Sequence, residues 1–200
     1  IPGTEFTADT ATLITELSLA GNRPVNWNVL MVTGRADERE RAARQLAITD
    51  FARARGAEVI ALTLPCTAEI YMNFNTGFLF DSNPGVWREV FKLPVAERMV
   101  KFRDPAFRRQ MTADAATMSA DNMLEFTSKI DNYRVVAVTA AQNKNCEGRI
   151  IGDIARERGV APIDVMLDIA LDDELMTIFA PVLGGNDRAS VALRGELWRD

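Results

Sequence analysis

The sequence of 200 residues contains no histidine. Without an imidazole, this chain alone cannot assemble a Ser-His-Asp or Cys-His nucleophilic site, and a zinc site would need cysteine and carboxylate ligands only. The two cysteines, Cys66 and Cys146, are far apart and show no metal-ligand spacing, so we expect two reduced thiols. Several large classes of hydrolase are therefore excluded for this chain by itself.

The sequence also lacks the features of nucleotide-binding, nucleic-acid-binding and membrane proteins. Neither Gly-x-Gly-x-x-Gly nor Gly-x-x-x-x-Gly-Lys-Ser/Thr occurs, so no phosphate-binding loop is predicted. The net charge of -5 offers no basic surface to nucleic acid or to an anionic membrane. Apolar runs such as VVAVTAA, at 135–141, are far shorter than the ~20 residues of a membrane span. We expect a cytoplasmic protein without nucleic-acid or membrane partners.

The composition that remains is that of a globular domain with a full hydrophobic core, at 48% hydrophobic and 26% charged residues. Residues 1–6, IPGTEF, are unlike the periodic sequence that follows. We interpret them as residues left by an expression vector and exclude them from the fold. The tail at 193–200 is set aside for the same reason.

The first third of the sequence predicts a β-α-β unit. Segments 23–32 and 58–65 are mostly apolar and β-rich, and turn residues bound them. Between them, apolar residues recur at helical spacing over 36–55, and Gly56 ends that helix. A connection of this length joins parallel strands. Continuous apolar runs suggest strands covered on both faces, as in a doubly wound sheet or a (β/α)8 barrel.

Segment 65–80 is irregular and aromatic, and we expect a long loop there. Such loops at the carboxyl ends of strands often hold ligands, although an aromatic lid packed without a ligand is an equal alternative. Asn28, Thr63 and Cys66 lie at or just beyond the predicted carboxyl ends of the two strands. They are weak candidates for substrate binding, and ordinary packing or capping at a strand end is the alternative.

Residues 84–129 carry a helical pattern throughout. Asp104 can cap a helix that begins at Pro105, and Ser119 opens a further helical segment. Basic residues of this region alternate with apolar ones at helical spacing, so we expect a solvated basic face and not a site for a ligand carboxylate. These residues are Arg98, Lys101, Arg103, Arg108 and Arg109.

The last third predicts a strand at 133–141 and a helical hairpin at 148–175. Gly159 suits a left-handed cap, and Pro162 suits the start of the second helix. Three consecutive acids end the hairpin: Asp172, Asp173 and Glu174. Consecutive side chains point in different directions, so we expect a solvated helix end and no metal site.

The hairpin sequence GRIIGDIARERGVAPIDVMLDIALDDELMTIF resembles the late helical region of N-acyl-D-amino-acid deacylases, the D-aminoacylase branch of the metal-dependent amidohydrolase superfamily. Three other segments agree in order. GNRPVNWNVLMV is similar to a middle barrel strand, NPGVWREVFKLPVAERMVKFRDPAFRRQM to a helical insertion, and APVLGGNDRASVA to the approach to the last barrel strand. The resemblance covers nearly the whole chain.

The resemblance implies a (β/α)8 barrel in which zinc activates a water for hydrolysis of the amide bond of an N-acyl-D-amino acid or a related small molecule. The family's metal ligands, which include an early His-x-His pair and a late aspartate, have no counterpart that we can place here. We therefore interpret residues 7–192 as the middle of a partial (β/α)8 (TIM-type) barrel with a helical insertion at 84–130. The hairpin then belongs to the barrel's outer layer. The full-length parent would be the zinc-dependent amidohydrolase, and this chain alone would be inactive.

Two alternatives remain open. The chain could be a stand-alone, non-catalytic α/β binding or regulatory domain whose aromatic loop, 65–80, clasps a ligand or a partner. It could also be a metal-independent barrel enzyme that uses carboxylates for acid–base catalysis. An incomplete barrel would expose sheet edges, so the barrel interpretation also predicts self-association.

Overall fold

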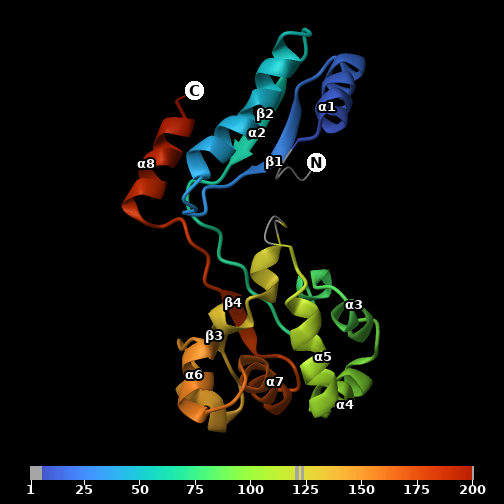
Figure 1. Cartoon of the computed structure of the whole chain (residues 1–200), viewed down its shortest axis with the longest axis vertical. Coiled ribbons are helices and arrows are strands. Elements are labelled where there is room, and N and C mark those ends of the chain that lie inside the picture. The colour runs from blue at the N-terminus through green and yellow to red at the C-terminus, as the bar shows by residue number, and fades with distance from the viewer. Residues whose placement is uncertain (1–5, 120–121, 123, 200) are drawn as a thin grey trace. The chain divides into compact units, whose positions relative to one another are not determined.

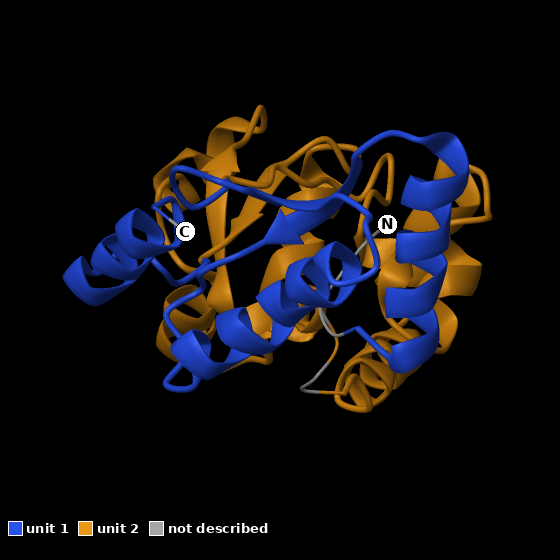
Figure 2. Cartoon of the chain, turned by 90° about the horizontal axis from the view of Figure 1, so that it is seen from above, with its two compact units in different colours: residues 1–68, 183–200 blue, residues 69–182 orange. Residues whose placement is uncertain are grey.

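The computed structural model describes residues 6–119, 122 and 124–199 (Figure 1). The chain is mixed α/β, as the sequence predicts, and divides into two compact units (Figure 2). Unit 1 comprises residues 1–68 and 183–200, and unit 2 comprises residues 69–182. Residues 1–5 of the segment attributed to a vector, and the last residue of the tail, lie outside the described residues. Phe6 is described, and its ring packs edge-on against Trp27 at 4.9 Å between centroids.

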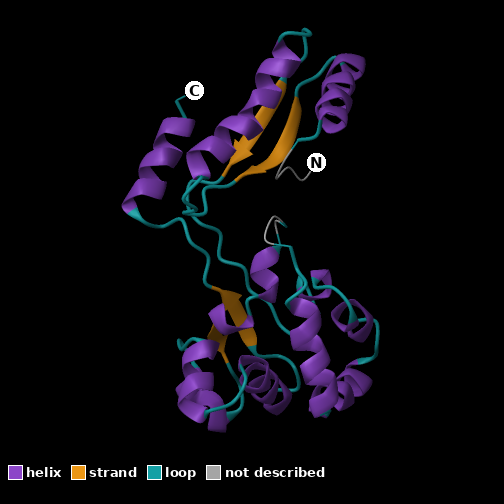
Figure 3. Ribbon diagram, viewed as in Figure 1, coloured by secondary structure: helices purple, strands orange, loops and turns teal. Residues whose placement is uncertain are grey.

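Unit 1 contains the predicted β-α-β unit (Figure 3). Strands β1 and β2 pair in parallel, with Val25 opposite Val59 and Asn28 opposite Leu62. Helix α1, which the sequence analysis does not predict, precedes them. Thr7 caps this helix by accepting a hydrogen bond from the backbone N–H of Thr10 at 3.2 Å. The elements of unit 1 are α1 (Ala8–Gly21), β1 (Val25–Leu30), α2 (Glu38–Arg53), β2 (Val59–Thr63) and α8 (Arg188–Leu197).

The core of unit 1 lies on one face of this strand pair. Trp27 of β1 and Val59 of β2 are buried in one cluster with residues of α1 and α2, such as Ile14 and Ile48. The intervening strand residues point to the other face and are exposed: Asn26, Asn28, Ile60 and Leu62. The alternation breaks only at Leu30, which is buried where the register of β1 shifts. Alternation of this kind marks strands with one covered face. The expectation of strands covered on both faces is therefore wrong for the described residues.

Unit 2 is mainly helical, as predicted for 84–129 and 148–175. Asp104 caps α5 by accepting from the N–H of Ala106 at 2.8 Å, and Pro105 is the first residue of that helix. Gly159 ends α6 with a φ of 67°, and Pro162 begins α7. Both signals are confirmed, because only glycine adopts the left-handed conformation at little cost and proline needs no N–H partner at a helix start.

The helices and strands of unit 2 are α3 (Val86–Val90), α4 (Val95–Arg103), α5 (Pro105–Ala115), β3 (Tyr133–Ala137), α6 (Ile151–Arg158), α7 (Pro162–Asp172) and β4 (Ile178–Pro181). Four 3-10 helices connect them: η1 (Phe80–Ser82), η2 (Glu125–Ser128), η3 (Ile130–Asn132) and η4 (Ala141–Cys146). Of the helical segment predicted to open at Ser119, residues 120, 121 and 123 lie outside the described residues.

The sheet of unit 2 is antiparallel. Strand β3, shorter than the predicted 133–141, pairs with β4, and Tyr133 lies opposite Pro181. Isolated bridges join Met72 to Phe179 and Arg134 to Ile150. Neighbouring strands of a (β/α)8 barrel are parallel, so this pair is not a barrel pair. The described residues form two small sheets and no complete barrel.

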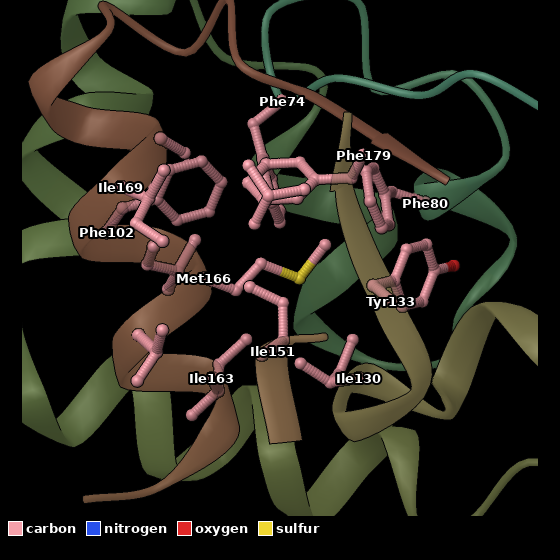
Figure 4. Close-up of a cluster of buried hydrophobic side chains, with 14 of the residues drawn as sticks. Phe74, Phe80, Phe102, Ile130, Tyr133, Ile151, Ile163, Met166, Ile169 and Phe179 are labelled. Atoms are coloured by element: carbon pink, nitrogen blue, oxygen red, sulfur yellow. The ribbon is translucent and has the colours of Figure 1, made fainter. Parts of the chain in front are cut away.

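Aromatic rings fill the core of unit 2 (Figure 4). Phe74 stacks on Phe80 with 4.4 Å between ring centroids, and Phe102 and Phe179 meet Phe74 edge-on. The predicted long loop at 65–80 is irregular as expected, but Phe74 and Phe80, its fully buried rings, belong to this core. Helices with the length and apolar character needed to cross a membrane are absent from the part of the chain that the structure describes.

The predicted solvated basic face is wrong for two arginines. Arg98 is only 5% exposed, and its guanidinium donates hydrogen bonds to the carbonyl oxygens of Phe74, Asn75, Phe91 and Leu93 at 2.6–3.0 Å. Arg108 of α5 bridges to Asp164 and Asp168 of α7 at 3.1 and 2.7 Å. The other three, Lys101, Arg103 and Arg109, are exposed as predicted.

Candidate functional site

The carboxyl ends of β1 and β2 are the place where the fold would build a ligand site. Parallel strands end at one edge, and α/β proteins bind ligands in the loops beyond that edge. Residues 31–37 follow β1 and residues 64–68 follow β2. A third segment, 183–187, comes from the far end of the sequence and packs against the loop after β1.

The three candidates predicted from the sequence do not form one cluster. Asn28 is exposed on the open face of β1. Thr63 lies at the end of β2, and its hydroxyl donates to the carbonyl oxygen of Leu30 at 2.9 Å, which joins the two strand ends. Cys66 is an exposed free thiol in the loop beyond β2. The hydroxyl of Thr63 thus has a structural role at the strand end, which is the alternative to substrate binding.

Glu38, the first residue of α2, organises the loop after β1. Its carboxylate is 5% exposed, and Oε2 accepts hydrogen bonds from the N–H of Thr33 at 2.7 Å, the hydroxyl of Thr33 at 2.8 Å and the N–H of Arg35 at 3.2 Å. A carboxylate at this position also suits the positive end of the helix dipole. Within the helix predicted at 36–55, the sequence distinguishes Glu38 from its charged neighbours by no local pattern. The signal that could have revealed it is the Thr33-Gly34 pair shortly before the helix, with backbone donors that need an acceptor.

Two consecutive glycines let segment 183–187 approach the loop after β1. A Cβ atom on Gly184 would lie 2.4 Å from the carbonyl oxygen of Thr33, and one on Gly185 would lie 2.4 Å from that of Val32. Both distances are too short for a side chain. The buried Arg194 of α8 holds the same segment by donating to the carbonyl oxygen of Gly185.

Polar side chains complete this edge. The hydroxyl of Thr67 donates to Oδ1 of Asn186 at 2.7 Å and so ties the loop after β2 to segment 183–187. Asp187 caps α8 by accepting from the N–H of Ser190 at 3.0 Å and from its hydroxyl at 2.5 Å. These bonds from Ser190 hold the pKa of Asp187 below its usual value. The carboxylates of Glu38 and Asp187 are thus engaged with backbone donors, and the third carboxylate of this edge, Asp37, pairs with Arg35 at 3.3 Å.

A zinc ion does not fit the residues of this edge. A zinc site needs three or four nitrogen, sulfur or carboxylate ligands around one point. Within the described ranges, no three Cys, Asp or Glu side chains gather closely enough to hold a metal ion. Cys66 is the single thiol near the edge, and the two buried or capping carboxylates already accept backbone hydrogen bonds. No catalytic step through zinc can be derived from the residues that the structure describes.

In unit 2, the loop after β3 is held by the acids that end α7. Asp173 is 4% exposed and accepts from the N–H groups of Thr139 and Ala140 and from the hydroxyls of Thr139 and Thr177, at 2.5–3.2 Å. Asp172 accepts from Nδ2 of Asn143 at 2.9 Å. The expectation of a solvated helix end is therefore wrong for Asp173.

The ionisation of Asp173 reflects the balance of two opposing effects. Burial by itself raises the pKa of this carboxyl, because it disfavours the charged form. The hydrogen bonds from Thr177, Ala140 and Thr139 act in the opposite direction and prevail, so its pKa lies below the usual value. The charged form of Asp173 is thus the one that the fold selects, and its role is to anchor the loop.

Comparison with known proteins assigns this chain to no family. We find no family model, no curated protein and no solved structure that matches the chain. The class that the structure defines is mixed α/β, and its described residues form one parallel and one antiparallel strand pair.

We expect replacement of Glu38 with alanine to lower the free energy of unfolding of unit 1 by about 2–3 kcal/mol, because three donors of the loop lose a charged acceptor. Glu38→Gln keeps one acceptor oxygen and should lose less. Urea unfolding of the full chain measures both. Glu40→Ala, an exposed acid on the same helix, is the control and should change the free energy by less than about 0.5 kcal/mol. Equal losses for Glu38→Ala and Glu40→Ala would show that the loop does not depend on this carboxylate.

Proposed function

We propose that this chain is part of a metal-dependent hydrolase that acts on the amide bond of N-acyl-D-amino acids or related small molecules. Segments outside this sequence would supply the zinc ligands and the catalytic carboxylate, and this chain would be inactive alone. The proposal starts from the sequence resemblance to N-acyl-D-amino-acid deacylases. The parallel pair β1/β2 is the structural observation that supports it best.

The layering of this pair is compatible with a segment of a (β/α)8 barrel. Its helices, α1 and α2, pack on one face only, and the other face is exposed. In a barrel, helices cover the outer face of each strand, and the inner face meets side chains from the other strands. Asn26 opposite Ile60, and Asn28 opposite Leu62, would line that interior. A two-stranded sheet with one open face is marginal in isolation, so further strands would stabilise it.

The edge described above then has a structural task within such an enzyme. Glu38, Arg194 and the two glycines at 184–185 fix the loop at the carboxyl end of β1. Thr67 ties the loop after β2 to the same segment. Barrel enzymes place their reacting groups at this end of the strands, and rigid loops position them. The chain's own contribution would therefore be to shape the site, while metal and proton transfer depend on residues elsewhere.

The alternative function, a binding or regulatory domain that clasps a ligand with its aromatic loop, receives less support from the packing. Phe74 and Phe80 of this loop are fully buried in the core of unit 2, where they contribute to stability. Tyr71 and Phe78 are the exposed rings that remain for a ligand. A ligand that raised the melting temperature saturably, with no turnover, would favour this alternative.

Hydrolysis of N-acetyl-D-amino acids tests the proposal directly, with the L enantiomers as matched control substrates. The isolated chain with added zinc should release no amino acid, and zinc should not raise its melting temperature. The polypeptide encoded by the complete reading frame that contains this segment should hydrolyse the D enantiomers, lose activity with a chelator and regain it with zinc. Turnover by the isolated chain would refute the division of labour, and an inactive complete polypeptide would refute the hydrolase function.

A further inference from the structure

Each unit has a hydrophobic core of its own. The larger cluster of buried apolar residues, with the residues packed against it, runs from Ile70 to Phe179 and lies wholly in unit 2. The smaller cluster lies wholly in unit 1, and its members come from both ends of the sequence, from Phe6 to Leu197. Among the described residues, the two clusters share no member. A segment with a complete core is the physical definition of a domain that can fold by itself.

The two ends of unit 2 lie side by side. Met72 and Phe179 exchange two backbone hydrogen bonds of 2.8 Å each. Val182, the last residue of unit 2, is held to Asn132 within the same unit. The backbone carbonyl of Asn132 accepts from the N–H of Val182 at 2.9 Å, and Nδ2 of Asn132 donates to the carbonyl oxygen of Val182 at 2.8 Å. Adjacent termini are what allows one domain to be inserted into a loop of another without distorting either.

The two segments of unit 1, on either side of residues 69–182, are hydrogen-bonded to each other. Thr67, two residues before unit 2 begins, is hydrogen-bonded to Asn186, shortly after unit 2 ends. Gly184 and Gly185 pack on the loop after β1, and α8 contributes Leu197 to the core of unit 1. The contacts that close unit 1 therefore come from its own residues, on both sides of the inserted segment.

We infer that residues 69–182 form an autonomously folding module inserted into unit 1 between β2 and α8. The module includes β3, β4 and the α6–α7 hairpin, and so extends well beyond the helical insertion expected at 84–130. The hairpin then belongs to the module and not to the outer layer of a barrel. If the proposed hydrolase function holds, the module follows the carboxyl end of β2, where insertions govern access to a barrel site. That last consequence rests on the proposed function, whereas the autonomy of the module does not.

Calorimetry of the full chain tests the inference with one variant in each unit. Arg98→Ala removes the buried guanidinium of unit 2 and should lower the midpoint of one transition by about 10 °C or more. Glu38→Ala should lower the midpoint of a different transition by about 8 °C or more and leave the first unchanged within about 1 °C. Arg98→Lys provides a milder version of the first change. Loss of one transition in Arg98→Ala, with the other intact, supports the inference in the same way.

A single transition that both variants lower together would overturn the inference. Limited proteolysis of the full chain with thermolysin gives a second, independent measurement. Cleavage should occur within 64–68 and 183–187 and leave a resistant fragment that corresponds to residues 69–182. Initial cleavage inside 69–182, with unit 1 still intact, would contradict an autonomous module. Neither readout depends on hydrolase activity, so failure of the proposed function and failure of this inference are distinguishable.

Discussion

Replacing Arg98 with alanine should lower the free energy of unfolding of unit 2 by about 3–5 kcal/mol. The guanidinium is 5% exposed and donates to four carbonyl oxygens, two of them in the loop before η1 and two in the segment that joins α3 to α4. It also lies over the ring of Phe91, at 5.0 Å from the centroid. Without it, these four carbonyl oxygens lose their donor, and the two chain segments lose the group that joins them.

The size of this effect follows from the shape of the side chain. Burial lowers the pKa of Arg98, yet a guanidinium stays charged at every pH at which proteins fold. Its planar fork reaches four acceptors at once, while a lysine ammonium at the same position would reach fewer. Arg98→Lys should therefore lose roughly half as much free energy as Arg98→Ala.

Urea unfolding of the full chain, followed by circular dichroism, measures this loss. Lys101→Ala is the matched control, because Lys101 is an exposed basic residue of the same helix, α4. The control should change the free energy of unfolding by less than about 0.5 kcal/mol. A loss below about 1 kcal/mol for Arg98→Ala would mean that water can replace the guanidinium at these carbonyls.

Local signals in the sequence were sufficient for part of the secondary structure. The β-α-β unit, the cap at Asp104 and the break between Gly159 and Pro162 depend on residues that are neighbours in the chain, and all three are confirmed. Helix α1 was missed because its exposed leucines, Leu13 and Leu17, blur the apolar stripe that marks an amphipathic helix.

The interactions that position the loops could not be predicted from the sequence. Arg98, Glu38 and Asp173 look like solvated charges, because charged residues at helical spacing are usually exposed. Their partners lie in loops whose paths depend on the tertiary fold, so no spacing rule identifies them. The contact of Gly184 and Gly185 with the loop after β1 joins residues about 150 positions apart, and it forms only in the folded chain.

The same limit explains why the candidate site remained weakly defined. Asn28, Thr63 and Cys66 were selected because they lie near strand ends, and that rule locates an edge without identifying the chemistry there. The structure shows that the edge is built from Glu38, Arg194 and a glycine pair from the far end of the chain. These residues hold the backbone of the loop after β1 and of segment 183–187 in place. None of them forms part of a metal-binding group among the described residues.

Replacing Asp173 with asparagine should lower the free energy of unfolding of unit 2 by about 2–4 kcal/mol at pH 7. The substitution keeps the size of the side chain and removes its charge. An amide NH2 then replaces one carboxylate oxygen among the N–H and O–H donors of Thr139, Ala140 and Thr177. Because the side chain is 4% exposed, water cannot readily replace the lost acceptor.

The effect of Asp173→Asn should depend on pH in a defined direction. The folded-state pKa of Asp173 lies below its ordinary value, which is about 3.9 in an unfolded chain. The ionised carboxylate therefore stabilises the fold fully above about pH 4, and this contribution is lost as the pH falls through the folded-state pKa. Urea unfolding at several pH values between 7 and 3 should show a difference between the native chain and Asp173→Asn that is constant near neutrality and shrinks in acid.

Glu174→Gln controls for the removal of a neighbouring negative charge, because Glu174 is exposed. It should have little effect at any pH in this range. A difference for Asp173→Asn that stays the same from pH 7 to pH 3 would show that shape, and not charge, accounts for the loss. A difference that grows in acid would contradict the direction of the pKa shift, because a carboxyl with a raised pKa would stabilise the fold most when protonated.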